Sequence, residues 1–296
     1  MTLSVYEVEM VSMSKAVAAA VMCAGVVVGS SCSAGASSGA DMKTKRVEYV
    51  AHRGASYAAP ENTLASVELA WKVGADAVEV DVYLSADGRV MVIHDATTRR
   101  TTGVDMKVEA TNSAKLRSLD AGKFKGAEFA GQKIPYLEEV IATIPEGRRL
   151  YVELKSDKRL VPVLEKMLEG NTRRGQIVFI CFKLDTIAAC KERMADIPAY
   201  WLAGGDKDKI TQAYIPIDPA IIQTAKEKKL DGLDLHSAGV TRELAGKIHA
   251  AGLSLAAWTI DDPAEAKRLI GLGVVSITTN RPDWVKQETE KLLKKK

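Results

Sequence analysis

Cysteine is scarce in this sequence, which contains four in 296 residues. Two of them, Cys23 and Cys32, lie in an N-terminal leader segment. Cys181 falls in an apolar strand pattern and Cys190 in a helical pattern, so we expect two buried thiols. The count and spacing do not favour a disulfide framework.

The sequence also lacks an excess of charge of one sign. Its formal net charge is +3, and the charged residues are scattered along the chain, so we predict no nucleic-acid partner. The apolar stretch at residues 16–28 is shorter than the roughly 20 residues that span a bilayer comfortably. These absences favour a globular domain preceded by a short leader.

The leader has the pattern of an export signal. From Met13, a lysine precedes the apolar stretch, and small residues follow it up to Cys32. Glutamates at positions 7 and 9 are unusual in such a signal, which favours Met13 as the true start. We therefore predict a signal peptide over residues 1–32 and a flexible tether, rich in Ser, Gly and Ala, over residues 33–45.

The small residues before Cys32 resemble the processing site of bacterial lipoproteins, after which lipid is attached to the cysteine. We expect an exported bacterial protein, either periplasmic or anchored to the outer membrane through lipid on Cys32. The alternative is ordinary cleavage near residues 34–36 and release of a soluble secreted protein.

Short apolar runs alternate with helical patterns from residue 46 to residue 296, which favours parallel strands joined by crossover helices. We predict a TIM-type (β/α)8 barrel, a fold that commonly needs about 250 residues. The expected strands cover residues 48–51, 77–82, 90–93, 150–154, 177–181, 200–202, 232–235, 254–258 and 274–278. Because nine runs compete for eight places, the turn signal Asp87-Gly88 suggests that the second or third run forms an antiparallel extension.

Residues 97–135 interrupt this alternation. The segment has no convincing period and is rich in Gly, Lys and Thr, so we interpret it as an insertion over the strand ends. Such excursions usually shape an active site or form a lid.

Residues able to carry out chemistry stand at the ends of the predicted strands, where barrel enzymes place their catalytic groups. Side chains alternate along a strand, so Glu79 and Asp81 share one face, as do Glu153 and Lys155. The other residues of this kind are His52, Arg53 and His94. Two proton carriers, a metal-binding carboxylate set and a phosphate-gripping arginine are the components needed to cleave a phosphate ester.

The carboxylates Glu79, Asp81 and Glu153 form a credible site for a hard divalent cation, Ca²⁺ or Mg²⁺. An alternative is a dry salt-bridge network in which Glu153 pairs with Lys155 or an arginine, and Glu79 with Arg53. Buried carboxylates need either a cation or such partners, because an unpaired buried charge is very costly.

The motifs occur in the order and at the intervals of one family. The chain resembles glycerophosphodiester phosphodiesterases from residue 47 to residue 284, through His52-Arg53-Gly54, Pro60-Glu61-Asn62-Thr63, Glu79-Val80-Asp81, His94-Asp95, and the segments 99–103, 153–155 and 257–260. The resemblance implies an eight-stranded barrel, a divalent cation on Glu79, Asp81 and Glu153, and acid and base roles for His52 and His94.

Further residues are expected to bind the substrate or support the site. Arg53 and Lys155 would balance the charge of the phosphate, and Trp258 would pack against a glycerol group unless it is a core aromatic. We expect Glu61 and Asn62 to support these groups from behind, with Asn62 also capping a helix that starts after Pro60.

Other positions are expected to matter less. Asn280 stands where relatives often have Asp, and Cys181 where they often have Ser; we expect neither to touch the metal or proton-transfer groups. His236 is a possible pocket residue, and His249 is expected to pack against its neighbours.

The resemblance implies metal-dependent hydrolysis of small glycerophosphodiesters to glycerol 3-phosphate and an alcohol. One alternative is a phospholipase or lysophospholipase of the same barrel type, against which the Lys and Gly content of the insertion argues mildly. Another is a non-catalytic glycerophosphodiester-binding lipoprotein, which would have no use for two proton carriers. The oligomeric state, the native metal and the alcohol stay open.

Overall fold

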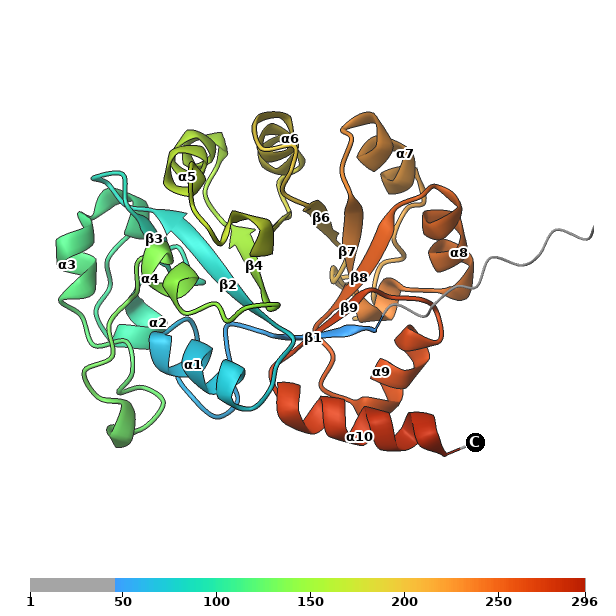
Figure 1. Cartoon of the computed structure of the whole chain (residues 1–296), viewed down its shortest axis with the longest axis horizontal. Helices are drawn as coiled ribbons and strands as arrows, with labels where there is room; N and C mark the ends of the chain where they lie inside the picture. The colour runs from blue at the N-terminus through green and yellow to red at the C-terminus, as the bar shows by residue number, and fades with distance from the viewer. Residues whose placement is uncertain (1–45, 296) are drawn as a thin grey trace, which may run out of the picture. The chain divides into compact units, whose positions relative to one another are not determined.

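The computed structural model of the protein describes residues 46–295. Eight parallel strands close into a barrel in the order β1-β9-β8-β7-β6-β5-β4-β2, and pairing of β1 with β2 completes the ring (Figure 1). Their bounds are β1 (Glu48–Ala51), β2 (Ala77–Leu84), β4 (Arg149–Leu154), β5 (Ile177–Cys181), β6 (Ala199–Ala203), β7 (Gly232–His236), β8 (Ser254–Trp258) and β9 (Ser276–Thr279). The predicted (β/α)8 barrel is confirmed.

The predicted leader, tether and lipid attachment at Cys32 lie outside the described residues. Within residues 46–295, no helix is long and apolar enough to cross a membrane.

The ninth strand is the antiparallel extension. Strand β3 (Val90–Val92) pairs antiparallel with the end of β2, with Val82 opposite Val92 and Leu84 opposite Val90. The Asp87 carboxylate in the connecting turn accepts hydrogen bonds from the backbone and side chain of Ser113, at 2.8 Å each. The turn therefore fastens the hairpin to the segment that follows it.

Helices surround the barrel (Figure 1). Their apolar faces pack on outward-facing strand residues such as Val78, Val80 and Val82. Some of these helices begin at capping residues: the side chains of Thr241 and Asp262 accept hydrogen bonds from backbone N–H groups of the first turn. Their bounds are α1 (Leu64–Lys72), α4 (Leu137–Ala142), α5 (Val161–Leu168), α6 (Leu184–Arg193), α7 (Ala220–Glu227), α8 (Arg242–Ala250), α9 (Pro263–Ile270) and α10 (Pro282–Lys294), with 3-10 turns η3 (Lys158–Leu160), η4 (Arg174–Gln176) and η5 (Ser237–Gly239).

The interior of the barrel is divided between an apolar floor and polar strand ends. The floor consists of inward-facing side chains from several strands, including Val50, Tyr151, Val178 and Tyr200. The expectation for the cysteines is confirmed: Cys181 and Cys190 are free and buried. Burial raises the pKa of the Cys181 thiol to about 12, so this group is not a nucleophile at neutral pH.

The segment predicted as an insertion folds into short helices with a core of its own. It contains α2 (Arg99–Thr102), η1 (Val108–Ala110), α3 (Ser113–Arg117) and η2 (Ala127–Phe129). Val108, Leu116 and Ile134 pack with Met91 and Ile93, which lie in and just after β3. The segment is therefore attached to the β2–β3 hairpin by a small hydrophobic cluster.

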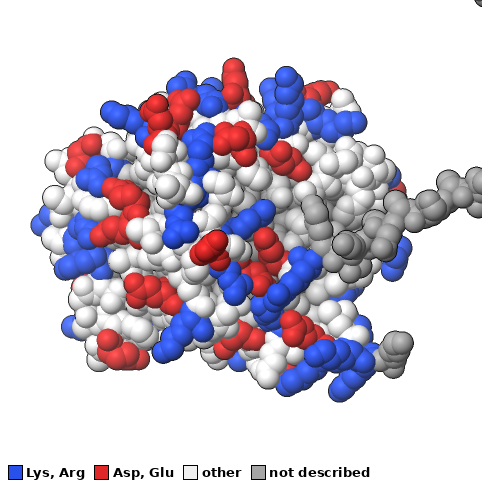
Figure 2. All heavy atoms as spheres, in the orientation of Figure 1, with Lys and Arg blue, Asp and Glu red and all other residues white. Residues whose placement is uncertain are grey.

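Basic and acidic side chains are interspersed over the face shown in Figure 2, without a broad area of one sign. Oppositely charged side chains at the surface also form ion pairs, such as Arg174 with Asp196 at 2.7 Å and Arg268 with Glu265 at 2.6 Å. On this face the scattered charge of the sequence is also scattered in space.

Gly54 adopts a backbone conformation that other residues disfavour, with a φ of 80°. A Cβ here would lie 2.5 Å from both the carbonyl carbon and the Oγ of Ser66, whose hydroxyl donates to the Arg53 carbonyl at 2.9 Å. The glycine of the His-Arg-Gly motif thus lets the loop after β1 touch helix α1.

A non-glycine residue in the left-handed region costs about 1–3 kcal/mol. We expect Gly54→Ala to lower the free energy of unfolding by more than this, because the new Cβ would also clash with Ser66. Gly74→Ala is the matched control, since Gly74 has a φ of 84° and open space around a Cβ. Urea unfolding of the two variants measures the difference. Equal losses would mean that the Ser66 contact relaxes without cost.

Candidate active site

A cavity of about 240 Å³ opens at the carboxyl ends of the barrel strands. The residues predicted for catalysis, metal binding and substrate binding that line it are His52, Arg53, Glu79, His94, Glu153, Lys155 and Trp258. Asp81 is fully buried beside them and contacts both Arg53 and Lys155. Barrel closure therefore brings together residues that lie more than 200 positions apart in the sequence.

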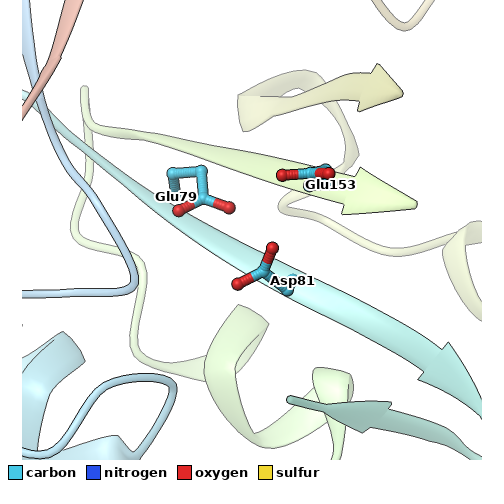
Figure 3. Close-up of side chains that lie close together, drawn as sticks. All are labelled: Glu79, Asp81 and Glu153. Atoms are coloured by element: carbon cyan, nitrogen blue, oxygen red, sulfur yellow. The ribbon is translucent and has the colours of Figure 1, made fainter. Parts of the chain in front are cut away.

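The three predicted metal ligands face one another (Figure 3). Glu79 and Asp81 project from β2 and Glu153 from β4, where Asp81 and Glu153 are register neighbours. One oxygen from each carboxylate lies within 4.8 Å of the others, and all three residues are buried. A buried set of oxygen ligands at this spacing could hold a hard divalent cation.

The electrostatics of the three carboxylates also suits a cation. Burial, together with the charge of Asp81, raises the pKa of Glu153 to about 7, and the same two causes raise the pKa of Glu79 well above its usual value. Burial acts to raise the pKa of Asp81 as well, but Lys155 and Arg53 overcome it and hold that pKa below the ordinary value. The positive charges of Lys155 and Arg53 therefore stabilise the ionised form of Asp81, while Glu79 and Glu153 lack enough positive charge to ionise as readily.

Part of the alternative salt-bridge network is present. The Lys155 ammonium lies 2.5 Å from Glu153 Oε1 and 3.0 Å from Asp81 Oδ1. The expected pairing of Glu79 with the Arg53 side chain is replaced by a hydrogen bond from the Arg53 backbone N–H to Glu79 Oε2, at 2.8 Å. Glu79 Oε1 is buried and has no hydrogen-bond partner among the described residues. Because the network leaves this oxygen unsatisfied, the residues fit a bound cation better than a closed set of ion pairs.

Glu61 and Asn62 contact the predicted site residues from behind. Asn62 Nδ2 donates to Asp81 Oδ2 at 2.8 Å, and the Asp81 backbone N–H donates to Asn62 Oδ1 at 3.1 Å. Glu61 accepts from Arg53 at 3.0 Å and from two nitrogens of Arg100. The expectation that Asn62 caps helix α1 is wrong: Thr63 caps it, because Asn62 has turned toward Asp81.

The expectation that Asn280 stays clear of the proton-transfer groups is also wrong. Asn280 Oδ1 lies 2.7 Å from His52 Nδ1, and Asn280 Nδ2 donates to Asp261 Oδ2 at 2.6 Å. The Asp261 contact orients the amide, so Asn280 presents its oxygen to His52 and Nδ1 must carry the proton. In the neutral ring, Nε2 is then free to accept a proton.

His52 is neutral at physiological pH in this environment. Burial lowers its pKa to about 4, and the neighbouring Arg53 adds to this effect. A neutral imidazole whose Nδ1 is occupied by Asn280 has the form required of a general base.

His94 has a different partner. Its Nδ1 lies 2.6 Å from Asp95 Oδ1, and the other oxygen of Asp95 accepts from Arg100 Nε at 2.7 Å. The anionic Asp95 can balance the charge of an imidazolium, whereas the neutral Asn280 amide beside His52 does not. The two histidines are therefore held in unlike surroundings at one cavity.

The family model for the glycerophosphoryl diester phosphodiesterase family matches residues 52–284. The chain belongs to this family. Glycerophosphodiester phosphodiesterases of Bacillus altitudinis and Caldanaerobacter subterraneus subsp. tengcongensis are 31% and 30% identical to it over 241 and 243 residues, which is 79% of this chain and 94% of each relative. The predicted family and enzyme class, a phosphoric diester hydrolase, are thereby confirmed.

A solved structure is similar as well. A phosphodiesterase of Oleispira antarctica, determined in complex with the product sn-glycerol-3-phosphate, is 29% identical to this family member. The two superpose with a TM-score of 0.75, and the match covers 82% of this chain and 96% of the other.

An aromatic wall forms one side of the cavity. Trp258 and Phe182 line it, with their rings in a T-shaped arrangement at a centroid distance of 5.5 Å. His236 packs against Trp258 at 4.9 Å, and Tyr214 lies 4.5 Å from His236. Trp258 Nε1 donates to the Asp234 carbonyl at 3.2 Å, which fixes the ring. His236 thus stands behind Trp258, whereas His249 on α8 contacts the Leu272 carbonyl on the outside of the barrel.

The charged cavity residue Asp234 was not anticipated from the sequence. Asp234 on β7 is 1% exposed, and burial together with the charge of Glu153 raises its pKa to about 8. Its Oδ1 has no hydrogen-bond partner among the described residues. The signal available was the alternation along β7, which puts Asp234 on the same inward face as His236.

Proposed function

We propose that this enzyme hydrolyses glycerophosphodiesters to glycerol 3-phosphate and an alcohol, with the help of a divalent cation, Ca²⁺ or Mg²⁺. The observation that carries the proposal is the convergence of three buried carboxylates and two differently held histidines on one cavity. The relatives named glycerophosphodiester phosphodiesterase support the same substrate class.

Glu79, Asp81 and Glu153 would hold the cation, and Asn62 keeps Asp81 in place for it. When bound, the cation supplies Lewis-acid polarisation of the phosphate and of a substrate hydroxyl. Arg53 and Lys155, which line the same cavity, bind and balance the negative charge of the phosphodiester.

His52 acts as the general base in this proposal. Its neutral Nε2 takes the proton of the glycerol 2-hydroxyl, and that oxygen then forms a bond to phosphorus. The Asn280–Asp261 pair keeps the ring in the required tautomer. Arg53 lies beside His52 and disfavours a second proton on it before substrate arrives.

His94 acts as the general acid. The bond from phosphorus to the departing alcohol breaks as His94 donates its proton, and a cyclic glycerol phosphate is left. Water then opens the ring with the two histidines in reversed roles, which gives glycerol 3-phosphate and restores both protonation states. Asp95 balances the imidazolium form of His94 in each cycle.

Product analysis tests this function. We expect the purified enzyme with CaCl₂ or MgCl₂ to release glycerol 3-phosphate from glycerophosphocholine and glycerophosphoethanolamine, measured with glycerol-3-phosphate dehydrogenase. Lysophosphatidylcholine serves as the competing substrate. Turnover of the lysolipid alone would support the phospholipase alternative, and calorimetric binding of the diesters without any product would support the non-catalytic one.

We also propose that the protein is exported and anchored through lipid on Cys32, a hypothesis supported by the sequence of the leader. Acyl chains would hold it at the membrane, at about 0.8 kcal/mol for each buried CH₂. We expect full-length protein in a Gram-negative host to incorporate labelled palmitate and to sediment with membranes, and Cys32→Ser to lose both properties. Soluble periplasmic protein beginning near Ser37 would contradict lipidation, and uncleaved cytosolic protein would contradict export.

A further inference from the structure

The Asp234 carboxyl is a buried acidic group in the catalytic cavity for which the proposed chemistry has no use. It lines the catalytic cavity but belongs neither to the cation ligands nor to the proton carriers. It is 1% exposed, and Oδ1 has no hydrogen-bond partner among the described residues. A buried carboxyl without a partner destabilises a fold, so its presence needs a compensating ligand or function.

The position of Asp234 in the barrel indicates which residues lie across the cavity from it. In the closed ring of eight strands, β7 lies four places from β2 in either direction, so Asp234 is on the wall opposite Glu79 and Asp81. A small molecule that fills the cavity therefore meets the carboxylate cluster on one side and Asp234 on the other. Two apolar side chains line the same cavity on this side, Leu202, which is the register neighbour of Asp234 on β6, and Ile180 on β5.

We propose that Asp234 recognises the free primary hydroxyl of the substrate's glycerol group, and so makes the enzyme selective for glycerol over deoxygenated alcohols. This inference rests on the proposed function. The phosphate and the 2-hydroxyl are engaged at the carboxylate side, and the primary hydroxyl is the remaining polar group of the glycerol.

The chemistry of the wall favours a hydroxyl over a cationic group of the departing alcohol. Burial favours the protonated, neutral form of the Asp234 carboxyl, which both donates and accepts a hydrogen bond, as a hydroxyl does. The departing alcohol differs between substrates and needs the open mouth, where Phe182 is 45% exposed. The glycerol is common to all of them, so a fixed, enclosed partner suits it.

The test pairs a substrate change with a protein change. Glycerophosphoethanolamine is compared with the analogue in which the free primary hydroxyl is replaced by hydrogen and the 2-hydroxyl is kept. Asp234→Leu preserves the branching of the side chain and removes its polar atoms, and Asp234→Asn keeps hydrogen-bonding capacity.

We expect the wild-type enzyme to prefer glycerophosphoethanolamine by at least about 10-fold in kcat/KM, because the analogue leaves the carboxyl unpaired. In Asp234→Leu this ratio should fall to near unity, and Asp234→Asn should lie between the two. The urea midpoint of Asp234→Leu should equal or exceed that of the wild type, since an unsatisfied polar group is lost. If Asp234→Leu does not fold, Asp234→Asn tests the proposal: its ratio of kcat/KM for the two substrates should be lower than that of the wild type.

Other outcomes separate the possible failures. Wild-type enzyme that hydrolysed both diesters equally well, or variants that kept the wild-type ratio, would overturn the role of Asp234 alone. If the variants changed only the preference between substrates that release ethanolamine and substrates that release ethanol, Asp234 would contact the leaving group. That result would also overturn the proposed contact with the glycerol hydroxyl. A wild-type protein that hydrolysed neither diester would overturn the proposed function itself.

Discussion

Chelation of divalent cations should abolish the release of glycerol 3-phosphate, and addition of Ca²⁺ or Mg²⁺ should restore it. Glu79, Asp81 and Glu153 place three buried carboxylates within 4.8 Å of one another, and Glu79 Oε1 has no protein partner among the described residues. Lys155 offsets part of this charge but cannot by itself polarise a phosphate and a hydroxyl together. The measurement is turnover in EDTA followed by back-titration with each ion.

Glu153→Gln is the matched variant for this experiment. It keeps the volume of the side chain and removes one anionic ligand, so we expect a higher cation concentration at half-maximal activity. Full turnover in excess chelator would contradict cation dependence, and an unchanged cation requirement in Glu153→Gln would favour the salt-bridge network.

The same carboxylates predict how pH affects the cation. The pKa of Glu153 in the folded protein is raised to about 7, so between its ordinary value and pH 7 the metal-free fold binds more protons than the unfolded chain does. The contribution of Glu153 to the free energy of unfolding of the metal-free protein is therefore lost as the pH rises through that window. A cation binds the ionised form, so the rise in Tm caused by CaCl₂ should be larger at pH 8 than at pH 5.5. An equal rise at both values would contradict proton–cation competition at this site.

The barrel could be predicted because parallel strands buried on both faces appear as short apolar runs. Three of the nine expected ranges, 48–51, 177–181 and 254–258, coincide with β1, β5 and β8. The antiparallel β3 followed from the Asp87-Gly88 turn, a local signal. The strands and the β2–β3 turn depend on residues that are close together in the sequence. The hydrophobic pattern and the turn residues were therefore sufficient to predict them.

The support around His52 could not be predicted in the same way. Asn280 and Asp261 follow β9 and β8, and they reach His52 because β9 pairs with β1 when the barrel closes. The sequence separation between His52 and Asn280 is 228 residues, so no local spacing relates them. Knowing that the first and last strands are neighbours would have indicated the contact, because both residues follow the carboxyl ends of their strands.

The insertion at residues 97–135 was predicted, but the short helices inside it were not, for a different reason. Its helices are three to five residues long, too short to show a helical period, and its core is shared with β3. Leu116 and Ile134 contribute to this cluster from segments that look irregular in the sequence. Structure built from single turns is set by tertiary packing, which a pattern of period 3.6 does not reveal.

Replacing either histidine should lower turnover by a factor of roughly 10²–10⁴, the range for a positioned acid or base. His52→Ala removes the neutral ring held by Asn280, and His94→Ala removes the ring held by Asp95. His249→Ala is the control, since this ring contacts the Leu272 carbonyl outside the barrel and should leave the rate nearly unchanged. Circular dichroism and melting curves show whether each variant is folded.

A substrate with a better leaving group separates the two roles. Cleavage of glycerophospho-p-nitrophenol releases p-nitrophenolate, a stable anion that needs little help from a general acid. The defect of His94→Ala in p-nitrophenol release should therefore shrink markedly. The defect of His52→Ala should persist, because the 2-hydroxyl still has to lose its proton before it attacks. The opposite pattern would exchange the assignments, and would mean that the amide contact of Asn280 and the carboxylate contact of Asp95 do not decide which ring is the base. Near-wild-type turnover in a folded His52 or His94 variant would make that histidine structural.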